Sequence, residues 1–285
     1  MLTNDSIIYH YCSVAVFQKI IETNTIWLTH ARQTNDVDEG IRYIKPLQSV
    51  VNSMSNLSDE EKSIVNSILK EHKERVEFPY IGCFSTKSDL LSQWRAYGDD
   101  GKGVAIGFEV GKIPHYDLLK KEHGNCGDIP IIIDEIAYDE KNNEVTFIEK
   151  IIQACLLIYR KTNNINHAIS AGVQGLNLLS VFSKNVDFEE ENEVRMAYFP
   201  CYFDLIANLS ELPTINANKM ELKFRTNRDK LISYYEFNLP QNAIQRIVLG
   251  PKCSIDKNQL TLFLNKYSPD VRRKNGIVKS NITYR

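Results

Sequence analysis

The sequence contains no apolar run long enough to cross a bilayer, and its first residues carry neither the basic segment nor the apolar stretch of an export signal. Its six cysteines form no Cys-x-x-Cys pair, and cysteines and histidines do not cluster at the spacing of zinc ligands. We therefore expect a cytoplasmic protein with reduced thiols, no membrane contact and no bound metal.

Net charge is also small. At −2 for 285 residues, it gives no overall attraction to nucleic acid or to an anionic membrane. The hydrophobic fraction of 43% and the charged fraction of 25% are ordinary for a globular protein. There are no repeats, linkers or low-complexity tracts. We predict one domain over residues 1–285, which is long enough to bury a substantial core.

Short β-prone segments alternate with amphipathic helical patterns. A strand is expected at residues 6–12, a helix capped by Ser13 at 14–22, and a strand at 25–29. Further strands are expected at 80–86, 104–109, 128–138, 191–199, 232–238 and 244–249. Further helices are expected at 41–74, with a break near 56–59, and at 143–161, 168–183 and 256–266. This predicts an α+β fold with short strands in mixed or antiparallel sheets, peripheral helices and a helical insertion at roughly 140–183.

Residues 191–199 carry the densest pattern of charge. With a period of two, Glu191, Glu193 and Arg195 share one side of a strand. Carboxylates two residues apart on a strand lie roughly 6–7 Å apart. The pKa of at least one then rises unless a cation compensates, and Arg195 is placed to do so. The pattern fits a catalytic glutamate held by its neighbours. It also fits an edge strand with a solvated charged face.

A second polar cluster lies in a loop after the second strand. Its oxygen-bearing residues are Asn35, Asp36, Asp38 and Glu39. Oxygen ligands this close in sequence suit Mg²⁺ or Ca²⁺. The same residues also suit an Asx-type turn that binds nothing.

The third strand and the turn after it carry further candidates. Cys83 lies inside an apolar strand, which favours an inert core thiol over a nucleophile. Trp94 and Tyr97 are three residues apart on one face of a short helix. They suit either the core or a stacking platform for a ring.

Several spaced motifs follow one another along the chain. They are Tyr9-His10-Tyr11, Asn35-Asp36 with Glu39, Cys83-Phe84-Ser85 leading to Trp94 and Tyr97, Lys184 before Glu191-x-Glu193-x-Arg195, Gly250-Pro251 and residues 280–285. In this order they resemble the bacterial domain-of-unknown-function family number 2971 over nearly the whole chain. That family name implies no activity.

A more distant resemblance does imply chemistry. A polar residue on the first strand, a Ser-Thr strand and a late Glu-x-Glu strand are together similar to the ADP-ribosyltransferase superfamily. The resemblance implies a split-sheet core and NAD as the substrate. By the same resemblance, His10 holds NAD, Ser85 with Thr86 shapes the nicotinamide site, and Glu193 with Glu191 acts on the nicotinamide ribose.

The resemblance also implies aromatic and cationic contacts with NAD. The candidates for stacking on its rings are Tyr9, Tyr11, Trp27, Trp94 and Tyr97, with Tyr97 the first choice. Arg195 supports the glutamates. The acceptor would be a protein, a nucleic acid or water. Proteins of this kind act as toxins or in antiviral defence and abortive infection, where a neutralising or regulatory partner is expected.

Two other functions fit the same residues. One is a metal-dependent nuclease or phosphoesterase that places Asp36, Asp38 and Glu39 with Glu191 or Glu193 around Mg²⁺. The near-neutral charge weighs against a nuclease that grips long duplexes, because phosphate contacts need clustered Lys or Arg. The other is a non-catalytic sensor or partner-binding module.

Overall fold

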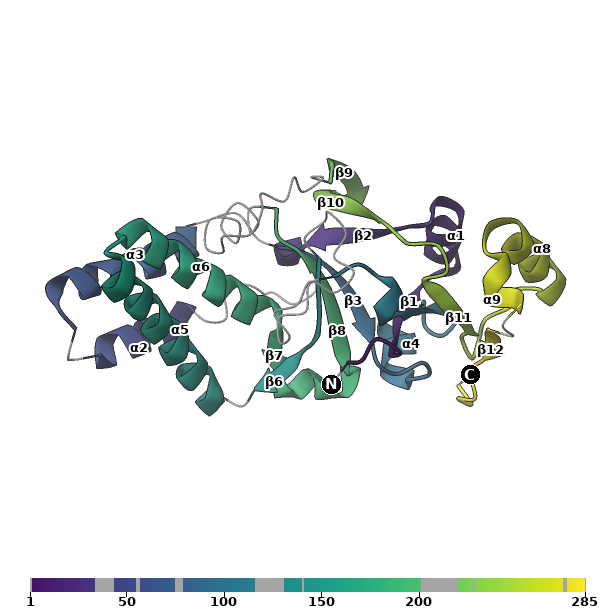
Figure 1. The fold of residues 1–285 in the computed structure, drawn as a ribbon. Coiled ribbons are helices and arrows are strands. Elements are labelled where there is room, and N and C mark those ends of the chain that lie inside the picture. The colour runs from purple at the N-terminus through teal and green to yellow at the C-terminus, as the bar shows by residue number, and fades with distance from the viewer. Residues whose placement is uncertain are drawn as a thin grey trace.

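A computed structural model describes residues 2–33, 44–54, 57–74, 79–115, 131–139, 141–200, 220–227, 229–273 and 276–284. In these ranges, ten strands form one mixed, open sheet. Helices pack against the sheet and also form a bundle beside it (Figure 1). The predicted α+β class with a mixed sheet is therefore confirmed.

The strand β3 (Tyr80–Ser85) is the branch point of the sheet. One of its edges pairs along its whole length with β8 (Glu193–Tyr198). The other edge is divided. Its last residue pairs with β1 (Ile7–Cys12), and its first two residues pair with β2 (Thr25–His30). Between these two pairings the sheet splits, and the middle of β3 faces the gap.

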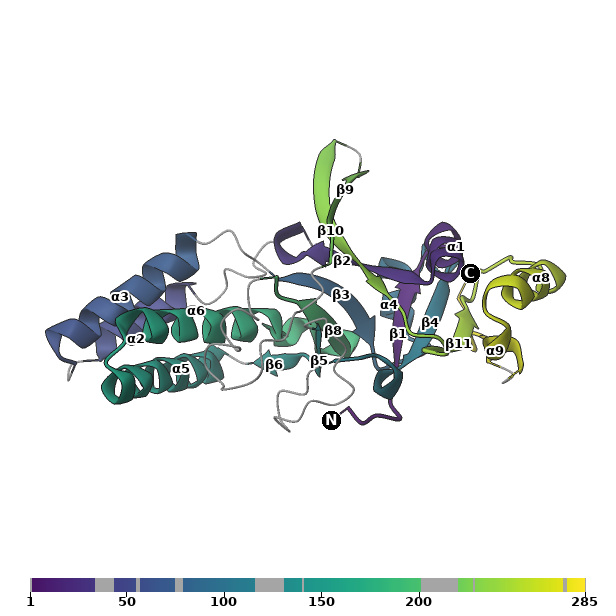
Figure 2. The same cartoon turned by 45° about the horizontal axis from the view of Figure 1, so that its top comes forward.

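The sheet extends in three directions from this branch. Beyond β1 lie β4 (Val104–Glu109), β11 (Ile244–Leu249) and β12 (Ile277–Lys279). Beyond β2 lie β10 (Lys230–Asn238) and β9 (Leu222–Asn227), which form the projecting hairpin of Figure 2. The free edge of β8 pairs with β5 (Ile131–Glu135). A separate parallel pair consists of β6 (Ala137–Asp139) and β7 (Ser183–Asn185).

The helix α1 (Val14–Thr23) connects the two strands that flank the gap. Ser13 caps it by accepting from the backbone N–H of Val16, as predicted, and Asn24 ends it with φ of 51°. Its buried face, which includes Phe17, enters the main core of the sheet. At the far end of the sheet, α8 (Lys257–Tyr267) and α9 (Pro269–Arg273) contribute to the same core.

Four helices form a bundle with its own core. They are α2 (Ile44–Ser53), α3 (Asp59–Glu74), α5 (Lys141–Thr162) and α6 (Ile165–Val181). The bundle lies at one end of the molecule in Figure 1. Its α5–α6 hairpin connects β6 to β7, the separate two-stranded pair. The last turn of α6 packs on the sheet, where Val181 meets Ala197 and Ile132.

The structure corrects one interpretation of residues 191–199. Glu193, Arg195 and Ala197 do share a side, as the period of two predicts, but β8 is a central strand whose six residues are all buried. A solvated edge strand is therefore wrong. Glu191 precedes the strand, at the end of a 3₁₀ helix, η3 (Val186–Glu191).

Among the described residues, no helix combines the length and the apolar character needed to cross a membrane.

Candidate functional site

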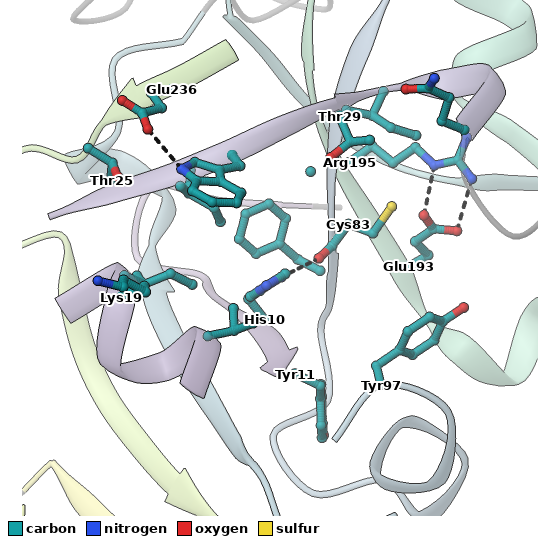
Figure 3. Close-up of a pocket in the computed structure, with 18 of the residues that line it drawn as sticks. His10, Tyr11, Lys19, Thr25, Thr29, Cys83, Tyr97, Glu193, Arg195 and Glu236 are labelled. Atoms are coloured by element: carbon teal, nitrogen blue, oxygen red, sulfur yellow. Dashed lines mark hydrogen bonds and ion pairs between the residues drawn. The ribbon is translucent and has the colours of Figure 1, made fainter. Parts of the chain in front are cut away.

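A pocket of about 570 Å³ opens at the split in the sheet. Its walls come from β1, α1 and β2, from the middle of β3, from α4 (Leu91–Ala96), from residues 184–195 and from the β9–β10 hairpin. Figure 3 shows Cys83 of β3 between His10 on one side and the Glu193–Arg195 pair on the other. A cavity of this size suits a small-molecule ligand.

A buried cluster of charged groups forms one end of the pocket. The guanidinium of Arg195 donates to Glu193 through Nε at 2.7 Å and through Nη2 at 3.2 Å. The ammonium of Lys184 donates to Glu193 at 3.1 Å and to Glu191 at 2.6 Å. Two cations therefore balance two carboxylates, as a buried charged cluster requires.

This arrangement keeps Glu193 ionised. Burial pushes the pKa of Glu193 upward, but the charges and hydrogen bonds of Arg195 and Lys184 outweigh it and hold the pKa below its ordinary value. Burial lowers the pKa of Lys184, but the two carboxylates outweigh burial and hold that pKa above its ordinary value. Both groups therefore carry full charge at neutral pH.

The local fold explains how these groups meet. Lys184 lies on β7, directly after the helical hairpin, while η3 turns the chain back so that Glu193 begins β8. The backbone N–H of Glu193 donates to the hydroxyl of Tyr138 on β6 at 2.7 Å. Arg195 also donates to the carbonyl of Val181 at 2.6 Å. The helical hairpin and the charged cluster are thus joined by direct hydrogen bonds.

Glu191 is the more accessible of the two glutamates. Its side chain is 14% exposed, against 5% for Glu193. The hydroxyl of Tyr97 lies 3.4 Å from its Oε1 and donates to it. Burial, with a contribution from Glu191, raises the pKa of Tyr97, so the phenol keeps its proton. Tyr97 lines the pocket, and the residue is 39% exposed.

His10 lines the pocket from β1. Its Nδ1 lies 3.0 Å from the carbonyl oxygen of Cys83. Because a carbonyl only accepts, Nδ1 carries the proton and Nε2 is left as an acceptor. Burial lowers the pKa of His10, and the hydrogen bond to Cys83 offsets this only in part. The imidazole is therefore neutral at physiological pH.

Cys83 differs from the expected inert core thiol. It is exposed, although β3 is central in the sheet, because the split leaves its side chain facing the pocket. It pairs with Arg195 across the strands, and its thiol donates a hydrogen bond to Glu193.

The segment that carries Tyr97 is anchored to the C-terminal residues through Asp89. Asp89 accepts from Trp94 Nε1 at 2.7 Å, from the hydroxyl of Ser280 at 2.6 Å and from the backbone N–H of Asn281 at 2.8 Å. The C-terminal segment therefore holds the start of α4, and with it the helix that leads to Tyr97.

The structure brings some predicted residues to the pocket and leaves others out. His10, Tyr11, Tyr97, Glu191, Glu193 and Arg195 line it. Ser85, Thr86 and Trp94 do not. Ser85 is fully buried and donates to the carbonyl of Glu191 at 2.7 Å, and Trp94 is a core residue with its ring edge-on to Tyr11 at 4.7 Å. Ser85 and Trp94 therefore support the site from behind.

The sequence predicted only one residue of the opposite wall, the stacking candidate Trp27. This wall consists of Lys19 on α1, Trp27 and Thr29 on β2, Arg225 on β9 and Glu236 on β10. These residues form no motif, and strand pairing over some two hundred positions is needed to bring them together. Only the period of two on β2 gave a signal, since it places Trp27 and Thr29 on one face.

The loop with Asn35, Asp36, Asp38 and Glu39 lies outside the described residues, so the proposed metal site there stays a prediction. Within the described part of the chain, His, Cys, Asp and Glu side chains form no group of three that could hold a metal ion.

Fold and site together define an α+β protein with a ligand-sized pocket and a charge-balanced carboxylate cluster at one end. Residues 93–196 match a family described as "Protein of unknown function (DUF2971)", which confirms the predicted family over that range. The match includes Tyr97 and the charged cluster, whereas His10 and the motifs after residue 196 lie outside it. No curated protein and no solved structure matches the chain. The similarity to ADP-ribosyltransferases stays a prediction.

Proposed function

We propose that this pocket binds NAD and that the protein cleaves the bond between nicotinamide and ribose, as an ADP-ribosyltransferase-like enzyme. One observation carries the proposal. The strands that bear Glu193, Ser85 and His10 lie side by side in the order β8–β3–β1, and the sheet splits beside them to form the pocket. The resemblance in sequence concerns the order of these residues along the chain, His10 first, then Ser85, then Glu193, and their meeting in one part of the sheet supports the proposal.

The charges of the cluster suit this reaction. Loss of nicotinamide leaves positive charge on the ribose, as in glycoside hydrolysis. A fixed, ionised carboxylate stabilises such charge. Glu193 is held ionised by Arg195 and Lys184, and Glu191 presents a second, more exposed carboxylate that also lines the pocket. In the proposal, Glu191 contacts the ribose or the attacking group, and Glu193 supplies negative charge behind it.

His10 and Tyr97 would hold the substrate. The Nε2 of neutral His10 can accept from a ribose hydroxyl, because Nδ1 is occupied by the carbonyl of Cys83. The half-exposed ring of Tyr97 offers a face on which nicotinamide can stack. The acceptor of the ADP-ribose would be a macromolecule or water, and the setting a toxin or defence effector with a regulatory partner.

The test is release of nicotinamide from NAD, with and without cell extract to supply an acceptor. We expect Glu191→Gln to lower the rate at least about 100-fold. Glu190→Gln is the matched control, because Glu190 lies next to Glu191, is exposed and does not line the pocket. Its rate should equal that of the wild type. Thermal unfolding of each variant shows that the fold is kept.

A wild type that neither binds NAD in calorimetry nor releases nicotinamide with extract present would refute the proposal. So would equal losses of activity in the Glu191 and Glu190 variants, because the effect would then not depend on the pocket.

A further inference from the structure

The charges that line the pocket are unevenly distributed. At the end formed by Glu191 and Glu193, the two carboxylates are matched by Lys184 and Arg195. This end therefore has no excess charge to attract an ionic ligand. Any excess has to come from the opposite wall.

Glu236 on that wall is also neutralised. Its carboxylate pairs with Lys223 at 2.5 Å and accepts from Trp27 Nε1 at 3.1 Å. Lys223 does not line the pocket, so it offsets Glu236 from outside. The remaining charged groups of the wall are the cations Arg225 and Lys19.

Arg225 is poorly satisfied. Its Nη2 donates to the hydroxyl of Thr29 at 3.3 Å, and its guanidinium lies 5.2 Å from the centre of the Trp27 ring. Its Nε is buried and has no hydrogen-bond partner. Among the described residues, no carboxylate forms an ion pair with it. A guanidinium has five N–H donors, and a partly buried one without an anion is a costly arrangement that a bound anion would relieve.

Lys19 supplies a second cation from α1. Its only ion pair among the described residues is with Glu22, at 3.9 Å, and its side chain is 69% exposed. Such a pair is too long and too hydrated to neutralise the ammonium. Both side chains line the same pocket, and among the described residues no carboxylate of the pocket pairs with either cation.

We infer that Arg225, assisted by Lys19, binds the phosphate group of a nucleotide in this pocket. Arg225 is the main contact, because a guanidinium can offer two parallel N–H groups to phosphate oxygens. The hydroxyl of Thr29, which orients Nη2, is a further donor within reach of the same oxygens. Only the identity of the nucleotide rests on the proposed function: if it is NAD, its two phosphates would lie at this wall.

The test uses ADP as the probe and adenosine as the phosphate-free comparison. Calorimetry on the wild type should show ADP binding that weakens as salt is raised. Arg225→Gln should weaken ADP binding about 10- to 100-fold and leave adenosine binding unchanged. Lys19→Gln should weaken ADP binding less, since its ammonium is more hydrated. Lys230→Gln is the matched control, because Lys230 is an exposed cation of the same hairpin that does not line the pocket.

Three results would overturn the inference. They are ADP binding that is unaffected by Arg225→Gln, an equal loss of adenosine binding, and no ADP binding by the wild type at millimolar concentration. Pyrophosphate that binds as tightly as ADP would overturn the nucleotide assignment in favour of a free-phosphate site.

The outcome is separable from that of the proposed function. Arg225-dependent ADP binding without release of nicotinamide would keep the phosphate site and reject NAD cleavage. Nicotinamide release that is insensitive to Arg225→Gln would keep NAD cleavage and reject the phosphate site at Arg225.

Discussion

Removal of Lys184 tests whether the buried cluster depends on balanced charge. In Lys184→Met, a side chain of similar length and no charge replaces an ammonium that is 8% exposed. Glu191 and Glu193 then face one another with Arg195 as the remaining cation, and Arg195 is hydrogen-bonded to Glu193. The variant should be less stable than the wild type at neutral pH.

The size of the effect follows from burial. Breaking a buried ion pair by removing one partner costs about 3–5 kcal/mol. The side chain of Glu191 is 14% exposed and can still be hydrated in part. The expected loss of stability is therefore near the lower limit, about 3 kcal/mol. That is roughly a hundredfold change in the unfolding equilibrium. Adding Glu191→Gln to Lys184→Met removes the unmatched charge and should recover about 1–2 kcal/mol.

Urea unfolding followed by tryptophan fluorescence measures these differences. The chain has two tryptophans, and both Trp27 and Trp94 lie in or behind the pocket. The four members of the cycle are the wild type, each single variant and the double variant. A Lys184→Met protein within about 0.5 kcal/mol of the wild type would refute the reasoning, as would a double variant whose loss is the sum of the single losses.

Three further predictions concern stability. The pKa of Glu193 is depressed in the folded state, so the stability that its charge contributes is present above the unfolded pKa of about 4.3 and is lost as pH falls through the folded pKa. The wild type should therefore lose stability on acidification more steeply than Glu193→Gln. Urea midpoints of the two proteins that fall in parallel across this pH range would contradict the prediction. Gly103→Ala should cost about 3 kcal/mol or more, because its Cβ would lie 2.1 Å from the carbonyl oxygen of Cys12; a melting temperature equal to that of the wild type would show that the strand can shift. Ser58→Ala should cost about 1 kcal/mol in thermal unfolding, because Ser58 and Glu61 cap the start of α3 through two reciprocal hydrogen bonds. An unchanged transition would show that these two hydrogen bonds do not stabilise the protein.

Local patterns predicted the local structure well. The first strand, the capped helix and the second strand follow from short-range periodicity and from Ser13, and the structure has them as β1, α1 and β2. The alternation along residues 193–198 likewise placed Glu193 and Arg195 on one face. Each of these features depends on residues within a few positions of one another.

Features that depend on distant pairing were missed. β8 is buried because β5 pairs with it across some sixty residues, which no pattern within 191–199 can reveal. Cys83 is exposed because β1 and β2 separate beside it, and its own apolar neighbours point to the opposite result. Arg225 carries no motif at all, and only the pairing of β9 with β10 and of β10 with β2 places it on the pocket.

The hydrogen bond between His10 and the carbonyl of Cys83 has a consequence for ligand affinity. The imidazole takes the place of a backbone donor at the point where β3 has no strand partner on that side. The ring is therefore oriented by the fold itself, and the conformational entropy of fixing it is lost when the protein folds. A ligand that accepts this orientation does not have to order His10 on binding, so less of its interaction energy is consumed and the same contacts give tighter binding.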